Sequence, residues 1–570
     1  MANSSRITNN NRLFFLVSAS ALVLIPAAAR AVVVPNAARP ETIGRQFKLD
    51  EKRPEVSNKP IVAVGDQSAK QLNGGISFEL KEIKFEGASQ LNTEELKQFY
   101  QDKIGKKISL QELNKIASDI TAYYRNQGLI LTRAIVPPQK IDKGVVKIRI
   151  IEGFVSDVQL RGDVGSADSV LYSYAEKIKA SKPLDAAMLE RYLLLMEDVP
   201  GVEARAVLQP SPTVSGASQV IVNITRRTLE GSTASIDNRG TRFLGPIQAT
   251  GALTANNILG LDEQTTMRVV NTPSDPSELK FFSLRHEEQL GSEGTKLIFD
   301  GNFIESKPQY TLEPFDIRGQ NYSLDVAVTH PLLRSRQSNW FINSDFSVSR
   351  VNLDVLGVNF YQDNLRVLKA GSSYDFVDST NAVNRLEGAF SKGFSWDADN
   401  NGLAHSRANG ESSFWKFTAN ATRVQPIWGA FSASLAVDGQ YSADPLLSTE
   451  EYSLGGKQFG SAYDNGELSG DSGLATRAEL QYNGSVQEDF LKTYQLYSFY
   501  DIGKVWNRDI IAASEYKAAS LASAGVGTRF NVVQALSGEV EVAFPLTRKV
   551  AVNGEDGDAP RFFFNLQYRY

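Results

Sequence analysis

The chain has 570 residues, a formal net charge of −5 and no cysteine. Its length predicts several domains, and the lack of cysteine excludes disulfide frameworks, thiolate metal sites and cysteine nucleophiles. Net negative charge argues against a sequence-independent grip on nucleic acid. Only three histidines are present, which leaves little for a metal site or acid–base chemistry, so we expect no cofactor, no metal and no catalysis.

The N-terminus has the pattern of an export signal. Arginines precede an apolar run from Leu13 to Ala29, and small residues flank Arg30. These features predict a signal peptide over residues 1–31. A membrane anchor is the alternative, and it is disfavoured because the apolar run is short and contains Pro26. Since no other stretch reaches the length of a membrane-spanning helix, any insertion into a membrane must use strands.

Residues 32–75 read as a linker rich in proline and charge, with a possible plug helix at Thr42 to Leu49. Two small α+β units follow at 76–153 and 154–228, each in the order βααββ. In the first unit, Ser109 and Glu112 predict a capping box at a helix start, and Gly128 ends that helix. The predicted elements are Ser77–Phe85, Thr93–Tyr100, Ser109–Gly128, Leu129–Val136 and Val145–Ile151, then Val155–Arg161, Ala167–Ala180, Asp185–Glu197, Glu203–Leu208 and Gln219–Thr225.

From about Leu229 to the end, the pattern changes to alternation of apolar and polar residues. The last segment shows it clearly, because Phe562, Phe564, Leu566, Tyr568 and Tyr570 share one face. A soluble sandwich could alternate in the same way. The export signal, the aromatic ends of the apolar faces and the alternation of long and short loops instead favour a transmembrane β-barrel over 229–570. At about 20 residues per strand and connection, roughly 340 residues give about 16 antiparallel strands.

Four stretches of the chain, in the same order, are similar to the outer-membrane transporters of two-partner secretion (the TpsB class, which includes haemolysin and filamentous-adhesin exporters). They are Gly128 to Gly153, Leu193 to Pro210, Asp237 to Pro246, and Leu454 to Asp471 followed by Phe499 to Gly503. The resemblance implies two periplasmic POTRA domains, a barrel in the outer membrane of a Gram-negative bacterium, and a secreted exoprotein as partner. We also expect a monomer surrounded by outer-membrane lipids.

The fourth stretch resembles the family's loop six and the lumen-facing strand on which that loop docks. The resemblance implies a conformational latch formed by Gly455, Gly456, Ser461, Tyr463, Phe499, Asp501 and Gly503. The family usually carries an arginine where this chain has Ser461, so Asp501 needs another cation, with Lys457 and Arg477 as candidates. Alternation along the strand also places Asp501 on the lumen side, where the alternative is an ordinary solvated aspartate.

A strand edge in the first unit is a candidate site for an unfolded client, because an extended peptide can add to an exposed edge through main-chain hydrogen bonds. The residues expected there are Leu129, Leu131, Arg133 and Ile135. Many such edges are only packed or blunted.

The function expected from these features is export of one unfolded exoprotein through the barrel. Two alternatives remain open, an assembly factor that inserts other barrels and a diffusion porin. Gly470 to Gly473 is similar to the nucleophile stretch of chymotrypsin-like proteases, but no histidine has a supporting context, so a glycine-rich loop is the preferred interpretation.

Overall fold

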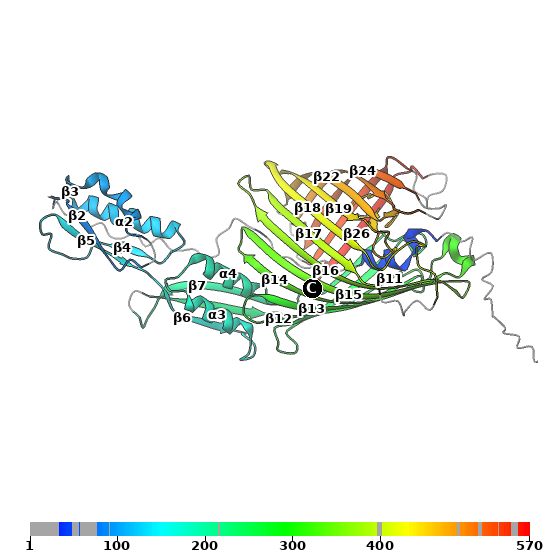
Figure 1. The fold of residues 1–570 in the computed structure, drawn as a ribbon, viewed down its shortest axis with the longest axis horizontal. Helices are drawn as coiled ribbons and strands as arrows, with labels where there is room; N and C mark the ends of the chain where they lie inside the picture. The colour runs from blue at the N-terminus through cyan, green and yellow to red at the C-terminus, as the bar shows by residue number, and fades with distance from the viewer. Residues whose placement is uncertain are drawn as a thin grey trace, which may run out of the picture.

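The computed structural model describes residues 34–47, 56, 77–89, 92–214, 217–395, 402–486, 491–510, 516–533, 535–548 and 557–570. Residues 1–31, where the sequence predicts a signal peptide, lie outside these ranges. So do most of the linker and the last two residues of the helix predicted at Thr42 to Leu49. Two small domains stand in a row at one end of a large barrel (Figure 1).

The large domain is a closed antiparallel barrel of sixteen strands, which confirms the predicted fold class. Each strand pairs with its neighbours along the chain, and β9 closes the ring by pairing with β26. The strands are β9 Thr233–Asp237, β10 Gln248–Asn256, β11 Gln264–Asn271, β12 Leu279–Leu290, β13 Thr295–Ser306, β14 Arg318–Arg334, β15 Ser338–Val355, β16 Val358–Val377, β17 Val383–Gly393, β18 Trp415–Trp428, β19 Phe431–Ser442, β22 Ser472–Ser485, β23 Thr493–Trp506, β24 Ala518–Val533, β25 Leu536–Pro545 and β26 Arg561–Arg569.

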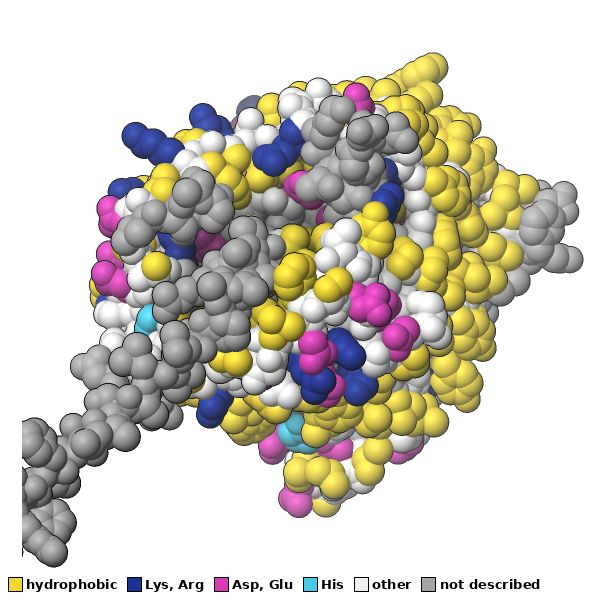
Figure 2. All heavy atoms as spheres, turned by 90° about the vertical axis from the view of Figure 1, so that its right-hand side faces the viewer, with side chains coloured by type: hydrophobic (Ala, Val, Ile, Leu, Met, Phe, Trp, Pro, Cys, Tyr) yellow, Lys and Arg dark blue, Asp and Glu magenta, His cyan; other side chains and the backbone are white. Residues whose placement is uncertain are grey.

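Alternation along each strand separates an apolar outer wall from a polar lumen. On β15, Trp340, Ile342 and Phe346 are exposed on the outside, while Asn343 and Asp345 alternate with them. Seen from the end opposite the small domains, hydrophobic side chains cover the flank of the barrel, and charged groups gather on the loops (Figure 2). A wall that is apolar outside and polar inside suits a barrel placed in lipid.

The two small domains share one plan, in which helices cover a three-stranded sheet. The sheet order is β2–β5–β4 in the first domain and β6–β8–β7 in the second. In each sheet the central strand, β5 or β8, runs parallel to β2 or β6 and antiparallel to the other edge strand. Their elements are β1 Ser77–Glu79, β2 Glu82–Glu86, β3 Lys107–Ser109, α2 Leu110–Asn126, β4 Arg133–Ile135 and β5 Val145–Ile151, then β6 Val155–Gly162, α3 Val170–Ala180, α4 Ala186–Glu197, β7 Val202–Pro210 and β8 Ser218–Arg226. Short 3-10 helices lie at Glu95–Phe99 and Gln101–Lys103. None of the helices in the described ranges has the length and hydropathy of a membrane span.

In the first domain, the sequence predicted the start of a helix correctly but predicted the short strands poorly. The capping box is present, since Ser109 and Glu112 each accept from the other's backbone N–H. The single strand predicted at Ser77–Phe85 is wrong, because β1 pairs with β3 while β2 pairs with β5. The strand predicted at Leu129–Val136 is also too long, because only Arg133–Ile135 pairs with β5. The residues before it form a turn between α2 and β4 that contacts the second domain.

Charged contacts fix the second domain to one rim of the barrel. Arg226 pairs with Asp262 of the β10–β11 turn at 2.5 Å, and both side chains are buried. Arg334 at the β14–β15 turn binds Asp198 through two hydrogen bonds of 2.7 and 2.9 Å. Lys177 reaches Glu293 of the β12–β13 turn at 2.7 Å. These turns therefore lie at the rim that carries the small domains, and the alternate loops lie at the opposite rim.

Candidate functional site: a lumen closed by two docked segments

Loop six is the segment between β19 and β22, residues 443–471, and it folds back from the far rim into the lumen. Its two arms pair with each other as β20 Tyr452–Leu454 and β21 Leu468–Gly470, and they form a sheet separate from the barrel. The tip, residues 455–466, needs a glycine at its first position. A Cβ on Gly455 would lie 2.0 Å from the carbonyl oxygen of Asp464, and its φ is +107°.

The tip of loop six docks on Asp501, which is fully buried on the lumen face of β23. The backbone N–H of Ser461 donates to Oδ2 of Asp501 at 3.2 Å, and the hydroxyl of Ser523 donates to Oδ1. The required cation is Arg477, whose Nη1 lies 3.3 Å from Oδ2 and also donates to the Ser461 hydroxyl at 2.5 Å. Arg477 and Asp501 are direct cross-strand partners of β22 and β23. Lys457, the other candidate, pairs with Glu539.

Two further wall arginines bind the tip through its main-chain carbonyl groups. Arg239, from the β9–β10 loop, donates to the carbonyl oxygen of Ser461 at 3.1 Å and pairs with Glu541 at 2.7 Å. Arg561 of β26 donates to the carbonyl oxygen of Ala462 at 3.2 Å and pairs with Asp464 at 2.8 Å. The sequence analysis missed both of these residues. At Asp501 and at the tip carbonyl groups, the barrel wall therefore supplies the positive charge.

The other predicted latch residues pack around the same contact. Tyr463 is buried, and its hydroxyl donates to the carbonyl oxygen of Ala522 at 3.2 Å. Phe499 lies under Arg477, whose guanidinium carbon is 4.0 Å from the ring centroid. At Gly503 a Cβ would lie 2.7 Å from the side chain of Leu454, so glycine permits the close approach of the loop. The structure thus brings together all seven residues of the predicted latch.

The base of loop six is held by Asp471, a residue of the protease-like stretch. Its buried carboxylate accepts from the backbone N–H of Leu446 and from that of Arg508, each at 2.7 Å, and from Nη1 of Arg407 at 2.5 Å. All three partners are main-chain groups or an arginine of neighbouring loops. Asp471 is therefore an anchor of the loop.

The second docked segment is α1, Pro40–Gln46, a short helix inside the barrel near the far rim (Figure 1). It packs against the lumen side of β13 and β14, where a Cβ on Gly44 would lie 2.9 Å from the side-chain amide of Asn321. The carboxylate of Glu41 accepts the hydroxyl of Tyr361 on β16 at 3.0 Å, with both side chains buried. The sequence had predicted a helix here but not its partners.

Most polar bonds of α1 and its flanking residues go to loop six rather than to the wall. Arg45 Nη1 donates to three main-chain oxygens of the loop, those of Ser448 at 2.6 Å, Thr449 at 3.1 Å and Glu451 at 3.2 Å. Nη1 of Arg39 donates to the Ser448 hydroxyl at 3.2 Å. The helix and the tip also touch, since a Cβ on Gly466 would lie 2.5 Å from Thr42.

Beside these two segments the lumen holds a polar cavity of about 1460 Å³. Its walls combine α1 residues, the loop-six tip and inward-facing polar side chains of many strands, among them Gln248, Asp300 and Arg385. This polar cavity would widen if the two docked segments left the lumen.

The four residues predicted to receive a client do not form one edge. Arg133 and Ile135 lie in β4, an edge strand, and Ile135 is 38% exposed. Leu129 and Leu131 belong to the turn between α2 and β4, where Leu129 packs on the first domain and Leu131 on the second. Helix α2 also covers part of the edge, because the hydroxyl of Thr121 accepts the N–H of Ala134 at 2.9 Å. The second domain has a longer edge strand, β7.

Two family matches cover most of the described chain. Residues 78–153 match the ShlB-type POTRA domain, and residues 216–530 match the family described as haemolysin secretion/activation protein ShlB/FhaC/HecB.

Relatives that match over nearly their whole length are described as transporters. The heme/hemopexin transporter protein HuxB of Haemophilus influenzae (strain 86-028NP) is 22% identical over 542 residues, covering 93% of this chain and 94% of that protein. The outer membrane transporter CdiB of Dickeya dadantii (strain 3937) is 22% identical over 557 residues, covering 93% and 95%. The solved structure of CdiB from Escherichia coli has a TM-score of 0.71 to this chain at 18% identity, covering 90% and 94%. That likeness shows the fold.

Proposed function

The chain belongs to the ShlB/FhaC/HecB family of haemolysin secretion/activation proteins, and we propose that it conducts one unfolded exoprotein through the lumen described above. The family exports partner exoproteins by two-partner secretion, with the barrel in the outer membrane and the POTRA domains in the periplasm. It is a transporter family and not an enzyme family. The rim that carries the small domains is therefore periplasmic, and loop six enters from the cell surface.

The observation that carries the proposal is the way in which the lumen is closed. Neither loop six nor α1 pairs with a strand of the barrel sheet in the described residues. Both are held by side chains, so they can leave while the ladder of sixteen strands remains intact. Departure of both segments would join the polar cavity to the space they occupy, and the lumen of a barrel of this size can hold an extended chain.

In the proposed mechanism, the client first binds to the periplasmic domains by strand addition. Main-chain hydrogen bonds at an edge accept many sequences, which suits an unfolded client. Arg133 and Ile135 offer a short edge in the first domain, and β7 offers nine residues in the second. Leu129 and Leu131 would instead set the angle between the two domains. No nucleotide-binding motif is present in the sequence, so folding of the client outside the cell would drive transport.

The predicted latch would act at the next step. Gly455, Gly456, Ser461 and Tyr463 on the loop and Phe499, Asp501 and Gly503 on the wall would separate as the client enters. Because Arg477 stays on the wall beside Asp501, the buried carboxylate keeps its countercharge after the tip leaves. At Asp501, release therefore leaves no unpaired buried charge, which would be costly. Release would still separate two ion pairs between loop and wall, Arg561 with Asp464 and Lys457 with Glu539.

We also propose the division of the chain into a signal peptide at 1–31, a linker with the plug helix at 32–75, POTRA domains at 76–153 and 154–228, and the barrel at 229–570. Each unit would act within a monomer, because the lumen of a single barrel supplies the path.

Deletion of the gene tests the function. We expect the loss of one large exoprotein from the culture medium, measured by mass spectrometry, with its unfolded form degraded or retained in the periplasm. A gene copy encoding the intact chain should restore secretion. Loss of many outer-membrane barrels would instead indicate an insertase, and a change limited to small-solute uptake would indicate a porin; either result would overturn the proposal.

A further inference from the structure

The lumen wall where the barrel closes carries a strip of uncharged polar side chains. Gln567 of β26, Ser235 of β9 and Thr250 of β10 are direct cross-strand partners and form one row across three strands. Thr233 precedes Ser235 by two residues, and Asn565 precedes Gln567 by two, so both face the same side of the sheet. All five side chains line the polar cavity of the lumen. These five residues are called the hydroxyl–amide strip below.

The hydrogen-bonding groups of the strip are not used by the protein itself. None of its five side chains forms a hydrogen bond within the described ranges. The charged wall next to it differs, because its side chains bind one another. Arg529 of β24, for example, pairs with Glu479 and with Glu539, each at 3.1 Å. Free hydroxyl and amide groups beside a cavity can bind a molecule that enters it.

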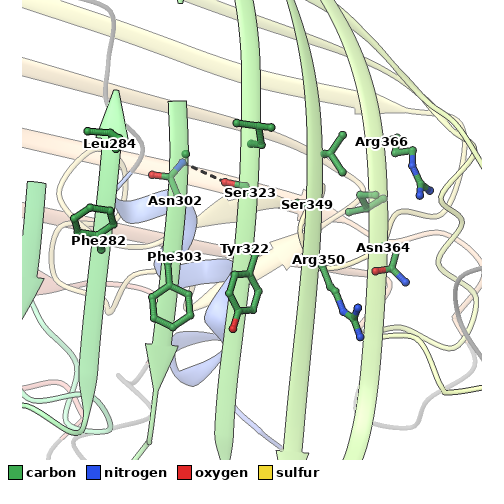
Figure 3. Close-up of a pocket in the computed structure, with 14 residues that line it drawn as sticks. Phe282, Leu284, Asn302, Phe303, Tyr322, Ser323, Ser349, Arg350, Asn364 and Arg366 are labelled. Carbon is green, nitrogen blue, oxygen red and sulfur yellow. Dashed lines mark hydrogen bonds between the residues drawn. The ribbon is translucent and has the colours of Figure 1, made fainter. Parts of the chain in front are cut away.

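On the opposite wall, uncharged polar side chains are used within the protein. Figure 3 shows the β12–β16 part of this wall, with Asn302 of β13 and Ser323 of β14 joined by a hydrogen bond of 3.1 Å. Asn302 also donates to Asp300 at 2.9 Å. In the same view, Phe282 is one of the exposed apolar side chains of the outer face. The polar groups of this wall are therefore less available to a ligand than those of the strip.

Arg268 of β11 adds two unpaired donors beside the strip. It lies directly across from Ala252 of β10, which in turn pairs with Thr233 of β9. Nε and Nη2 of Arg268 are buried and have no hydrogen-bond partner in the part of the chain that the structure describes. The guanidinium carbon lies 4.9 Å from the ring centroid of Phe281, and the side chain lines the polar cavity. Because a buried N–H group without a partner is unfavourable, this position favours a ligand that brings acceptor oxygens.

The lumen already shows how arginines bind a polypeptide there. Arg239, Arg561 and Arg45 each donate to main-chain carbonyl oxygens of loop six. Such bonds depend on the main chain of the loop and not on its side chains. Arg268 offers the same donors to the same cavity, and the oxygens of the strip can accept from main-chain N–H groups. The chemistry of the strip and of Arg268 therefore matches the main chain of an extended peptide.

The strip also lies between the second POTRA domain and the docked tip of loop six. At its periplasmic end, residues 227–232 join β8 to β9, and Asn256 at the end of β10 donates to the carbonyl oxygen of Arg227 at 3.0 Å. Beyond its other end, Arg239 and Arg561 bind the tip. A polypeptide that moves from the POTRA domain to the tip along this wall passes the strip.

We propose that the hydroxyl–amide strip and Arg268 form a binding site for the main chain of an extended, uncharged segment of the polypeptide in transit. The site rests on the proposed transport function and gives the lumen its own point of contact with the client. Recognition of peptide groups accepts many sequences, as transport of an unfolded chain requires. Most of the bonds would join uncharged groups, which bind more weakly than charge-assisted pairs, so a bound segment can move on.

Site-directed cross-linking tests the position of the site. Because the chain has no cysteine, a benzophenone can be attached to single introduced cysteines in the full chain. The probe is a long biotinylated peptide of alternating glycine and serine, added to the protein in detergent. We expect cross-links from S235C and Q567C to exceed those from N343C on β15 and T418C on β18 roughly fivefold, which corresponds to one hydrogen bond.

The affinity for a fluorescent form of the same peptide, measured by anisotropy, tests the hydroxyl groups. Loss of one hydrogen bond between uncharged groups lowers affinity roughly fivefold, so T233V/S235A/T250V should bind about a hundredfold more weakly. The matched control, T418V/S434A, loses lumen hydroxyl groups on β18 and β19 and should bind as the unsubstituted chain does. Unchanged heat-modifiability on a denaturing gel would show that each variant folds.

The same measurement tests the arginine. R268Q should bind the peptide roughly tenfold more weakly, because it loses charge-assisted hydrogen bonds to carbonyl oxygens. R385Q removes a lumen arginine that pairs with Asp375 and should bind normally. A polyglutamate peptide of the same length should bind no better than the glycine–serine peptide, since the strip carries no positive charge.

Three results would overturn the proposal. The first is equal cross-linking at the four positions, or none at any of them. The second is unchanged affinity in both T233V/S235A/T250V and R268Q. The third is preferential binding of polyglutamate, which would make Arg268 a site for carboxylate groups. If deletion of the gene still abolishes secretion of one exoprotein, each of these results removes this site and leaves the transport function standing.

Discussion

The two segments that close the lumen are held in different ways. Loop six is tied to the barrel wall, since Arg239, Arg477 and Arg561 bind its tip and its two ends continue into β19 and β22. Helix α1 packs on β13 and β14 and bonds to the wall through Glu41 and Gln46, while Arg45 and Arg39 bind main-chain and hydroxyl groups of loop six. Most polar bonds of the helix therefore depend on the position of loop six.

This difference predicts an order of opening. Undocking of loop six should release α1, because the partners of Arg45 move with the loop. Release of α1 should leave the tip docked, because no bond between the tip and the three wall arginines passes through the helix. The chain has no cysteine, so single introduced cysteines at Gln46 for the helix and at Gln458 for the tip can report each segment separately.

Substitution of the central wall arginine should have the greatest effect. R477A leaves the buried carboxylates of Asp501 and Glu541 with less countercharge, which costs about 3–5 kcal/mol for a broken buried pair. We expect both reporters to become mobile by electron paramagnetic resonance and the conductance in planar bilayers to rise. R385A removes a lumen arginine that pairs with Asp375 away from both segments, and it should leave both reporters immobile. A tip that stays docked in R477A would show that the arginine does not hold it.

Removal of the helix anchor should have a smaller and more selective effect. R45A loses charge-assisted hydrogen bonds to three loop carbonyl groups, worth about 2–3 kcal/mol together once water replaces them. The reporter at Gln46 should become mobile while the reporter at Gln458 stays immobile. For the conductance measurement, Q46A, which loses one amide bond to Gln248, is the control. Mobility at both positions would contradict the proposed order.

Crowding the contact between loop and strand should weaken docking moderately. In G503A the new methyl would lie 2.7 Å from the fully buried Leu454, and overpacking of this kind costs about 1–3 kcal/mol. We expect partial mobility at Gln458 and a modest rise in conductance. G251A adds a methyl to β10 where no atom lies within 4 Å, and it should behave like the unsubstituted chain. Equal behaviour of the two variants would argue against close docking at Gly503.

The smallest effect should come from pH. His405 lies in the surface loop beside loop six, and its hydrogen bond to Asp363 raises its pKa above the ordinary value of 6.5. A raised pKa means that the contact stabilises the folded loop below pH 6.5 and that this contribution is lost as pH rises through the higher folded-state value. Mobility at Gln46 should therefore increase slightly with pH, whereas H405Q should show no such dependence. A pH response retained in H405Q would assign it to another group.

Much of this architecture could be predicted from patterns of residues close together in the sequence. Alternation of apolar and polar residues predicted the strands, and the export signal, the aromatic ends of the apolar faces and the loop lengths favoured a barrel over a sandwich. The same alternation placed Asp501 on the lumen face of its strand. The capping box at Ser109 was equally local. Short strands were predicted poorly, since a three-residue strand such as β4 carries no period of its own.

The wall arginines that hold the loop tip come together only in the folded barrel. Arg239 and Arg561 are far apart in the chain, and they meet at the loop tip because β9 pairs with β26 and completes the ring. Arg477 faces Asp501 through a register that a single-strand pattern does not contain. Residue type and alternation within one strand determined which side chains face lipid and which face the lumen, because successive side chains point to opposite faces of the sheet. Which charges meet depends on the closure of the sheet, and so only the tertiary structure decided it.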